Sequence, residues 1–352
     1  MGAVSRGKNG YFCLAGHPDK RRLLTLSPFY VKYIVMKFPK GRPILENTRL
    51  EFINLDNVLS ASKRERAHRI SGYISIIYPE SEELIFLKQG EPFNSARINQ
   101  KERKIIAIGE VIEKAKKATS GILSEYATDE VLLNLIISSI TLSPIKADVD
   151  LSRLQPKIFI DKLKSTKFEG FIWIRCGLEE SYIHFDKGEI SGCYIAGRGD
   201  KTQDDNEIVA LLQKQGTVIS IFDRIETLTP TQATPAQVDM FCKIFSSLFR
   251  SYAQPIGNAL VLKTIVIAKA TAQKDFPFID ELKIAPDLAV NGKMIIEPKV
   301  LSQGMARWFD LVYESFSTLL GKENDVIAKK VLNDYRFALK SLNFFDHTKL
   351  KI

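Results

Sequence analysis

Hydrophobic and polar positions alternate in two stretches of the chain that lie 98 residues apart. The first, GYISIIYPESEELIFLKQGEP, covers residues 72–92, and the second, GFIWIRCGLEESYIHFDKGEI, covers residues 170–190. Seven of the 21 aligned positions are identical. A period of two is typical of β-strands, and the glycine near the end of each stretch suits a tight turn. Each stretch therefore predicts three strands in an antiparallel meander.

The same alternation assigns residues to the two faces of each meander. Four residues on one face are predicted to be core: Ile85, Leu87, Ile183 and Phe185. On the other face His184 stands where the first copy has Phe86. We interpret His184 as a half-buried packing residue and not as a ligand or a base.

The resemblance between the copies continues beyond the meanders. Each copy continues with a helix, a strand and a second helix, predicted over residues 101–117, 121–126 and 129–140 in the first copy and 206–215, 216–222 and 238–249 in the second. The sequence thus predicts an α+β fold with two tandem modules, each an antiparallel β-meander plus helices. The modules are too long and too few for a solenoid.

After Pro255 the alternation fades, and a mainly helical C-terminal domain is expected. Residues 256–271, 300–320 and 326–342 are interpreted as helices, and Asn291-Gly292 as the turn of a hairpin. One helical stripe comprises Val326, Ile327, Val331, Leu332, Tyr335 and Leu339. Such a stripe is either part of the domain's own core or a dimerisation or docking surface. The predicted regions are a basic N-terminal segment (1–44), the first module (45–145), the second module (150–250) and the helical domain (251–352).

The net charge of +9 is concentrated at the start of the chain. Residues 1–70 hold 14 Lys and Arg against 5 Asp and Glu, so they account for the whole excess. A basic segment attracts nucleic acid, anionic lipid or an acidic protein surface, or is simply solvated. Met36 offers an alternative start, and whether residues 1–35 belong to the natural protein stays open.

Cations also distinguish the two copies. The first copy carries an insertion within LSASKRERAHRISG, residues 59–72, with Lys63, Arg64, Arg66 and Arg69. These four are candidate contacts for an anion or a partner, against the alternative of a solvated loop. Arg198, in Gly197-Arg198-Gly199-Asp200, is a fifth candidate, because this run resembles half of a phosphate-binding loop.

The second copy also resembles a known family. The runs IDKL (160–163), FEGFIWI (168–174), YIHFDKGEI (182–190) and GTVISI (216–221) are similar to the PATAN domain, which stands at the N-terminus of PatA-like bacterial regulators. Residues 55–126 show the same pattern more weakly. The resemblance implies a regulatory interaction module of bacterial signalling, with a receiver-domain or small-GTPase-pathway protein as partner, and it supplies no catalytic residues.

The sequence contains no established catalytic or metal-binding motif. A P-loop, a zinc-protease motif, a nucleophile elbow and a Cys-x-x-Cys pair are all missing, and the four cysteines are interpreted as buried apolar residues in a reducing compartment. No uncharged apolar run is long enough for a transmembrane segment. We therefore expect a cytoplasmic, non-catalytic signalling scaffold with no cofactor or metal. The alternatives are nucleic-acid or anionic-lipid binding through the basic region and a receptor for a small anionic ligand, such as a nucleotide second messenger. The oligomeric state stays open.

Overall fold

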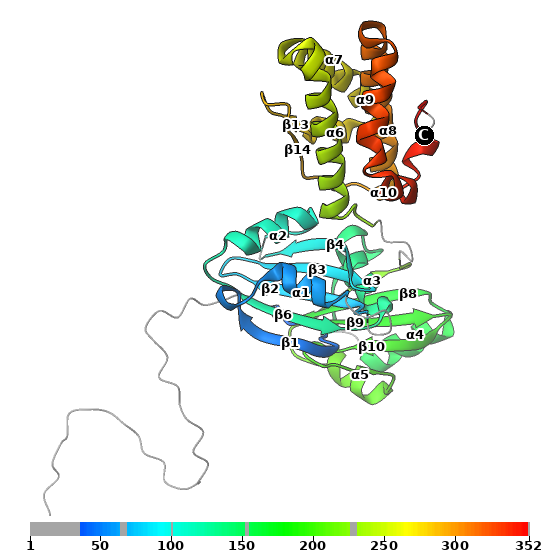
Figure 1. Ribbon diagram of the computed structural model, residues 1–352. Helices are drawn as coiled ribbons and strands as arrows, with labels where there is room; N and C mark the ends of the chain where they lie inside the picture. Colours follow the sequence, from blue (N-terminus) through cyan, green and yellow to red (C-terminus); the bar gives the residue numbers. More distant parts are fainter. Residues whose placement is uncertain (1–35, 64–68, 100, 152–154, 226–230, 351–352) are drawn as a thin grey trace, which may run out of the picture. The chain divides into compact units, whose positions relative to one another are not determined.

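The computed structural model describes residues 36–63, 69–99, 101–151, 155–225 and 231–350 (Figure 1). The first module contains β1 (Arg42–Arg49), η1 (Leu50–Phe52), α1 (Leu55–Ala61), β2 (Gly72–Ile77), β3 (Glu82–Lys88), β4 (Glu91–Ile98), β5 (Arg103–Ile105), α2 (Ile108–Lys117), β6 (Ile122–Ala127) and α3 (Glu130–Thr141). The second module contains β7 (Lys146–Asp150), α4 (Pro156–Ser165), β8 (Gly170–Cys176), β9 (Glu179–Asp186), β10 (Glu189–Tyr194), β11 (Lys201–Thr202), α5 (Asp205–Leu212) and β12 (Thr217–Phe222).

Each module builds one antiparallel sheet of six strands. The strand order is β1-β6-β2-β3-β4-β5 in the first sheet and β7-β12-β8-β9-β10-β11 in the second. Reading along either order, each strand of one module has a counterpart in the same place of the other. The duplication predicted from residues 72–92 and 170–190 therefore extends to the topology of the whole sheet, and the predicted α+β fold class is confirmed.

The first glycine of each meander has the same surroundings in both copies. A Cβ on Gly72 would lie 1.9 Å from the carbonyl oxygen of Tyr126 in β6, and one on Gly170 would lie 2.1 Å from that of Phe222 in β12. Side chains are excluded from both positions because the neighbouring strand passes too closely. The two glycines therefore have the same structural role in two related folds: each allows the neighbouring strand to approach closely.

The second glycine of each meander forms the predicted tight turn. Gln89 and Gly90 both have positive φ, at 50° and 79°, and Lys187 and Gly188 repeat this with 50° and 87°. Two successive residues with positive φ suit a two-residue hairpin whose twist matches the flanking strands. The turns joining β3 to β4 and β9 to β10 are thus equivalent.

Each sheet has its own apolar core on one face. In the first module Ile85 and Leu87 pack with residues of α1 and α2, and in the second Ile183 and Phe185 pack with residues of α4 and α5. All four side chains are buried, as the alternation predicted. Each module therefore encloses a separate core between its sheet and two helices, α1 and α2 in the first and α4 and α5 in the second.

A third core joins the two modules. It combines Tyr73 and Phe86 from the first sheet, Phe171 and Tyr182 from the second, and the apolar residues of α3. The rings of Phe171 and Phe222 stack within it, with centroids 4.4 Å apart. We call this junction of the two modules the seam; because it is rich in aromatic side chains, it buries much apolar surface.

Residues 36–44, the described part of the predicted basic segment, pack against the two modules. Phe38 is buried in the seam core, and the backbone of Lys37 donates to the carbonyl oxygen of Leu178 at 2.8 Å. The boundary predicted between residues 44 and 45 is wrong, since it falls inside β1. The strand continues through this point because its partner β6 pairs with it from Arg42 onward.

The C-terminal region is helical, as predicted. It contains α6 (Pro235–Ile256), α7 (Asn258–Asp275), η3 (Pro277–Glu281), β13 (Lys283–Ile284), β14 (Val290–Asn291), α8 (Pro298–Leu320), α9 (Lys322–Asn333), α10 (Arg336–Ser341) and η4 (Phe344–Asp346). Its core is rich in aromatic rings: Phe245 of α6 stacks on Trp308 of α8 with centroids 4.5 Å apart. Within the described part of the chain, no helix has the length and apolar composition needed to span a membrane.

Three details of this region differ from the sequence-based predictions. The predicted domain boundary at residues 250/251 lies inside α6, because the apolar face of α6 packs into the helical core along its length. Asn291 lies in β14 and is no turn residue; the hairpin turns at residues 285–289, where Leu288 has a φ of 65°. Val326 is exposed although its helical stripe is otherwise directed to the core.

Candidate functional site

The predicted cation cluster is only partly within the described residues. Arg64 and Arg66 lie outside them. Lys63 follows α1, and its ammonium group contacts the carboxylate of Glu91 at 2.6 Å. Arg69 is exposed. The structure thus shows one of the four predicted residues in an ion pair.

Arg198 lies in a loop that joins the two modules. Its guanidinium group pairs with Glu207 at 3.0 Å. Its carbonyl oxygen accepts from the amide of Lys40 at 2.8 Å, and the Gly197 amide donates to the Phe38 carbonyl at 2.9 Å. Because the loop already uses these groups to bind the chain near residue 40, its geometry does not match a free phosphate-binding loop.

Two polar residues of the second module have structural roles. Asp204 caps α5, accepting from the Asn206 amide at 2.8 Å. His184 is half-buried, hydrogen-bonds to Ser191, and has a pKa lowered by burial, which agrees with a packing role. Among the described residues, no group of three or more His, Cys, Asp and Glu side chains could hold a metal ion.

A buried ion pair crosses the seam. Arg103 of β5 donates to the carboxylate of Glu180 in β9, whose second oxygen accepts from the Trp173 indole and the Tyr182 hydroxyl, both at 3.0 Å. Glu180 is fully buried. The guanidinium groups of Arg103 and Arg175 each lie 4.3 Å from the Trp173 ring. Both oxygens of this buried carboxylate therefore have hydrogen-bond donors, one of which is the guanidinium group of Arg103.

Glu82 is the counterpart of Glu180 in the first module and is almost as deeply buried. Ser75 donates to one of its oxygens at 2.6 Å, and the other oxygen has no side-chain partner within the described residues. Burial, together with the charge of Glu180, raises the pKa of Glu82 from its ordinary value of 4.5 to about 8. At neutral pH Glu82 is therefore mostly protonated, whereas its twin is paired with an arginine.

The helical domain is attached to the first module by a buried glutamine. Gln232 precedes α6, and its side-chain amide donates to Asn94 at 2.7 Å and to the Ile106 carbonyl at 2.9 Å. Its carbonyl oxygen accepts from the amide of Ile108, the first residue of α2. Because these groups are buried and satisfied by one another, the attachment is specific.

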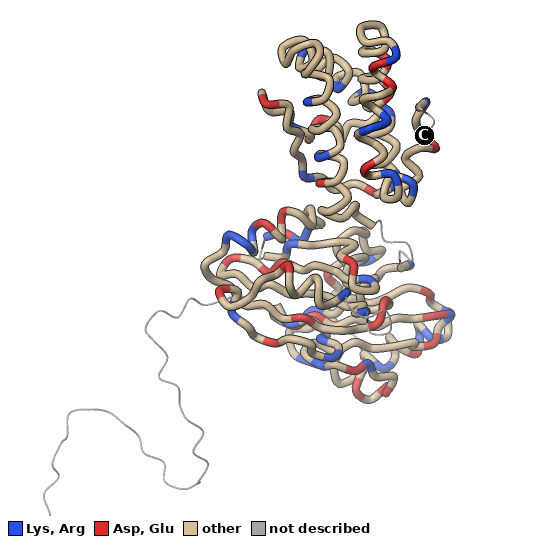
Figure 2. The backbone as a smooth tube through the Cα atoms, viewed as in Figure 1, with Lys and Arg blue, Asp and Glu red and all other residues tan. Residues whose placement is uncertain are grey.

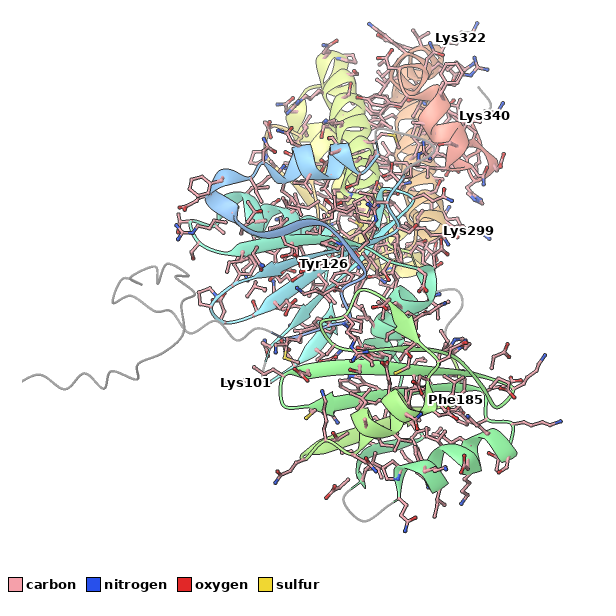
Figure 3. All side chains as sticks on the ribbon, turned by 90° about the horizontal axis from the view of Figure 1, so that it is seen from below. Lys101, Tyr126, Phe185, Lys299, Lys322 and Lys340 are labelled. Atoms are coloured by element: carbon pink, nitrogen blue, oxygen red, sulfur yellow. The ribbon has the colours of Figure 1, made fainter. Side chains whose placement is uncertain are left out.

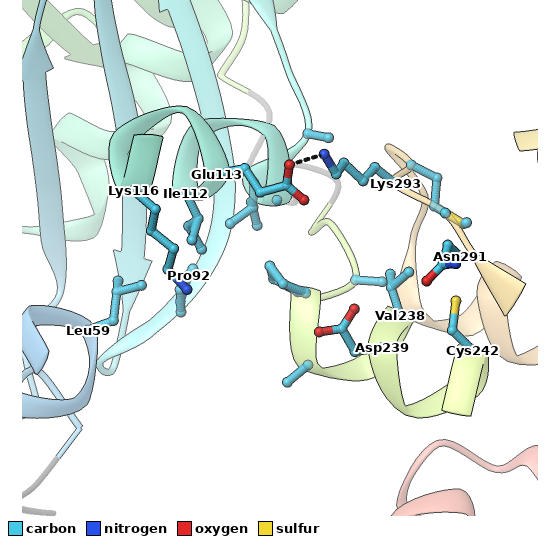
Figure 4. A pocket seen from close by; sticks show the side chains of 18 of the residues that line it. Leu59, Pro92, Ile112, Glu113, Lys116, Val238, Asp239, Cys242, Asn291 and Lys293 are labelled. Carbon is cyan, nitrogen blue, oxygen red and sulfur yellow. Dashed lines mark hydrogen bonds and ion pairs between the residues drawn. The ribbon is translucent and has the colours of Figure 1, made fainter. Parts of the chain in front are cut away.

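A groove of about 910 Å³ lies beside this attachment (Figure 4). Leu59 of α1 and Ile112 of α2 line it from the first module, and Val238 of α6 lines it from the helical domain. At its edge Lys293 forms an ion pair with Glu113, drawn as a dashed line in Figure 4. The groove is therefore apolar within and charged at its rim.

The charges at this rim divide into paired and unpaired groups. On the first module, Lys116 pairs with Asp56 at 2.8 Å. On the helical domain, three lining residues have no ion pair with any described residue: Asp239, Glu281 and Lys283. Burial raises the pKa of the Cys242 thiol on the groove wall to about 11, so it is protonated at neutral pH. The groove thus combines an apolar wall with charged side chains of both signs.

The seam offers less room than this groove. Side chains of α3 and of both sheets occupy the space between the modules. Two hollows along it have volumes of about 270 and 220 Å³. The first is lined by Arg42, Arg198 and Lys201 as well as by Asp129 and Asp200, so its charges are mixed.

The fold and these sites define a tandem α+β protein with a helical domain attached to its first module. Comparisons with protein-family models, with curated proteins and with solved structures gave no match. The resemblance to the PATAN domain therefore stays a prediction.

Sequence reasoning missed the residues that join the parts of the chain. Glu82 and Glu180 were aligned as identical positions of the repeat, but alignment alone did not show that both are buried at the seam. Gln232 lies in the polar run TPTQATP, which reads as an ordinary linker. Only its position beside buried backbone groups of the first module gives it a role.

Proposed function

We propose that the protein is a non-catalytic scaffold of bacterial signalling in the cytoplasm, and that it binds a segment of a partner protein in the groove beside Gln232. The groove is the observation that carries this proposal. Its apolar interior can accommodate aliphatic or aromatic side chains of a partner. The charged groups of Asp239, Glu281 and Lys283, which have no ion pair with a described residue, can bind polar or charged groups of that partner.

The tandem architecture supports the same function. One module alone would expose the aromatic face that forms the seam, so the duplicated modules act as one body. The helical domain is attached to that body by Gln232, and the groove requires residues from both. A composite surface of this kind recognises a partner only when the chain is correctly folded. The resemblance to PATAN domains adds a receiver-domain or small-GTPase-pathway protein as the expected partner class.

A photo-crosslinking amino acid at position 112 tests this proposal. Ile112 lines the groove, whereas Ile158 on α4 is 61% exposed and lies outside it, so position 158 is the matched control. We expect the probe at 112 to capture a defined protein in cells, and the probe at 158 not to. The captured protein should then bind the purified chain, and Val238→Arg, which places a charge in the apolar groove, should reduce its affinity at least about tenfold.

The proposal fails if both probes give the same pattern of capture, or if Val238→Arg leaves the affinity unchanged while the variant remains folded. Binding of a nucleotide second messenger to the purified chain, unaffected by Val238→Arg, would instead support the ligand-receptor alternative.

A further inference from the structure

The last helices of the helical domain carry a group of exposed cations without an ion-pair partner in the described part of the chain. These are Lys322, Lys329, Lys330, Arg336 and Lys340. Across the described residues, none of the five forms an ion pair, whereas most cations of the two sheet modules do, including Lys63, Arg97 and Lys164. Figure 2 shows blue segments, with red ones among them, on the part of the tube that Figure 1 labels α9 and α10. Unpaired cations remain available to an external anion.

The α9 cations share one face of the helix. Lys322, Val326, Lys329 and Asn333 recur at intervals of three or four residues, so they lie above one another on a helix with 3.6 residues per turn. Lys330 borders this face. The opposite face, with Ala328, Val331 and Leu332, is buried in the helical core. The exposed face of α9 is therefore positively charged along its length.

The cations of α10 continue this surface after the break at residues 334–335. In Figure 3 the labelled Lys322 and Lys340 both lie on the outer side of the helical domain. Glu323 and Asp334 are exposed at its borders, and Asp325 accepts a hydrogen bond from the Tyr313 hydroxyl. The five cations thus outnumber the acidic groups beside them.

The same two helices carry two exposed apolar side chains. Val326, on the α9 face that holds Lys322 and Lys329, is 65% exposed, and Phe337, next to Arg336 in α10, is 90% exposed. A single exposed apolar side chain needs no explanation. An aromatic and an aliphatic side chain that both project from a surface of unpaired cations have a more specific chemistry: they combine apolar insertion with attraction to negative charge.

We propose that the surface formed by these five cations with Val326 and Phe337, the α9–α10 surface, binds an anionic lipid bilayer. Lysine and arginine near such a bilayer are attracted to its acidic headgroups, and apolar side chains beside them enter the headgroup and acyl boundary. A nucleic acid would also attract the cations, and its bases could stack on Phe337. It has no corresponding interaction with the aliphatic side chain of Val326. The bilayer accounts for both apolar residues.

The test uses the full chain and vesicles of phosphatidylcholine, with or without roughly one third phosphatidylserine. We expect co-sedimentation only with the anionic vesicles. The double variant Lys329→Glu/Lys330→Glu should weaken binding at least about 25-fold, since each cation near the surface contributes about fivefold. The matched control is Lys157→Glu/Lys162→Glu, which makes the same charge change at exposed lysines of α4 and should leave binding within about twofold.

Insertion is tested separately with Phe337→Trp. The natural tryptophans, Trp173 and Trp308, are buried, so the new side chain reports on the surface. Its emission should shift to shorter wavelength with anionic vesicles, and Phe337→Ser should weaken binding while Ile158→Ser, at another exposed apolar residue, should not.

The proposal is overturned if the chain does not bind anionic vesicles, or if the α9 and α4 double variants bind equally well. It is also overturned if an oligonucleotide binds the chain more tightly than the vesicles do, with dependence on Lys329 and Lys330. Unchanged Phe337→Trp emission would show contact through charge alone and would refute the insertion.

Discussion

Replacing Glu82 by glutamine should make the protein more stable at neutral and alkaline pH. Glu82 is buried at the seam, and only one of its oxygens has a donor among the side chains described, the Ser75 hydroxyl. Glutamine has the same shape, keeps an oxygen that accepts from Ser75, and carries no charge. The substitution therefore mimics the protonated glutamic acid at every pH.

The magnitude follows from the pKa of Glu82. Burial and the charge of Glu180 raise this pKa from 4.5 to about 8. The native state holds the proton more tightly than the unfolded chain does. The stability from this group is therefore fully present below pH 4.5 and is lost as the pH rises through about 8. At 1.36 kcal/mol per pKa unit, the wild type should lose about 3 kcal/mol between pH 5 and pH 8 relative to Glu82→Gln.

Urea unfolding at several pH values, followed by circular dichroism and by fluorescence, measures this difference. Trp173 lies at the seam, so its emission reports on the relevant region. The two free energies of unfolding should be similar at pH 5, and the variant should be the more stable at pH 8. If the difference between the two free energies of unfolding stayed constant across this pH range, Glu82 would not be protonated in the native state.

Glu180→Gln is the matched comparison, because it makes the same substitution at the equivalent position of the second module. It removes the partner of the buried Arg103 and should destabilise the chain by about 3 kcal/mol or more at neutral pH. Two equivalent glutamates should thus respond with opposite signs, an outcome that a general effect of removing negative charge would not produce.

Two further predictions concern the duplication and the attachment of the helical domain. Gly72→Ala and Gly170→Ala should each destabilise the chain by at least about 2 kcal/mol in thermal unfolding, because a Cβ would overlap a carbonyl oxygen, whereas Gly109→Ala, with open space at its Cβ, should be neutral or slightly stabilising. Gln232→Ala should leave buried polar groups without partners and should speed hydrogen exchange at the Ile108 amide, measured by mass spectrometry; unchanged exchange there would contradict the role of Gln232 as an anchor.

The sequence predicted the parts of the fold that depend on local periodicity. Alternation placed Ile85 and Ile183 in the module cores, and the shared glycines placed the turns at Gly90 and Gly188. These features are visible in a sequence because each depends on residues a few positions apart. The Asn291-Gly292 turn failed for a related reason: the dipeptide favours a hairpin, but the amide of Val290 is held by the Ser246 hydroxyl of α6, and the strand begins there.

The candidate sites were harder to predict from the sequence, because they depend on contacts between segments that are distant along the chain. Lys63 and Arg198 were chosen as cations in unusual places, and the structure shows both in ion pairs with acidic residues. The sequence pattern did not distinguish the cations of α9 and α10, since regularly spaced lysines on an amphipathic helix are common. Whether a cation has a partner is a property of the folded chain, and composition does not reveal it.

The difference between Glu82 and Glu180 shows how a duplicated module became specialised at the seam. Glu180 has two donors in its own sheet, Trp173 and Tyr182, whose counterparts in the first module are Ser75 and Leu84. Leucine donates no hydrogen bond, so the first module supplies fewer donors to its glutamate. Because Arg103 pairs with Glu180, and no ion pair of Glu82 with a described residue is found, ionising both glutamates would leave one buried charge uncompensated. A proton on Glu82 removes this charge, and the stability of the seam therefore depends on pH.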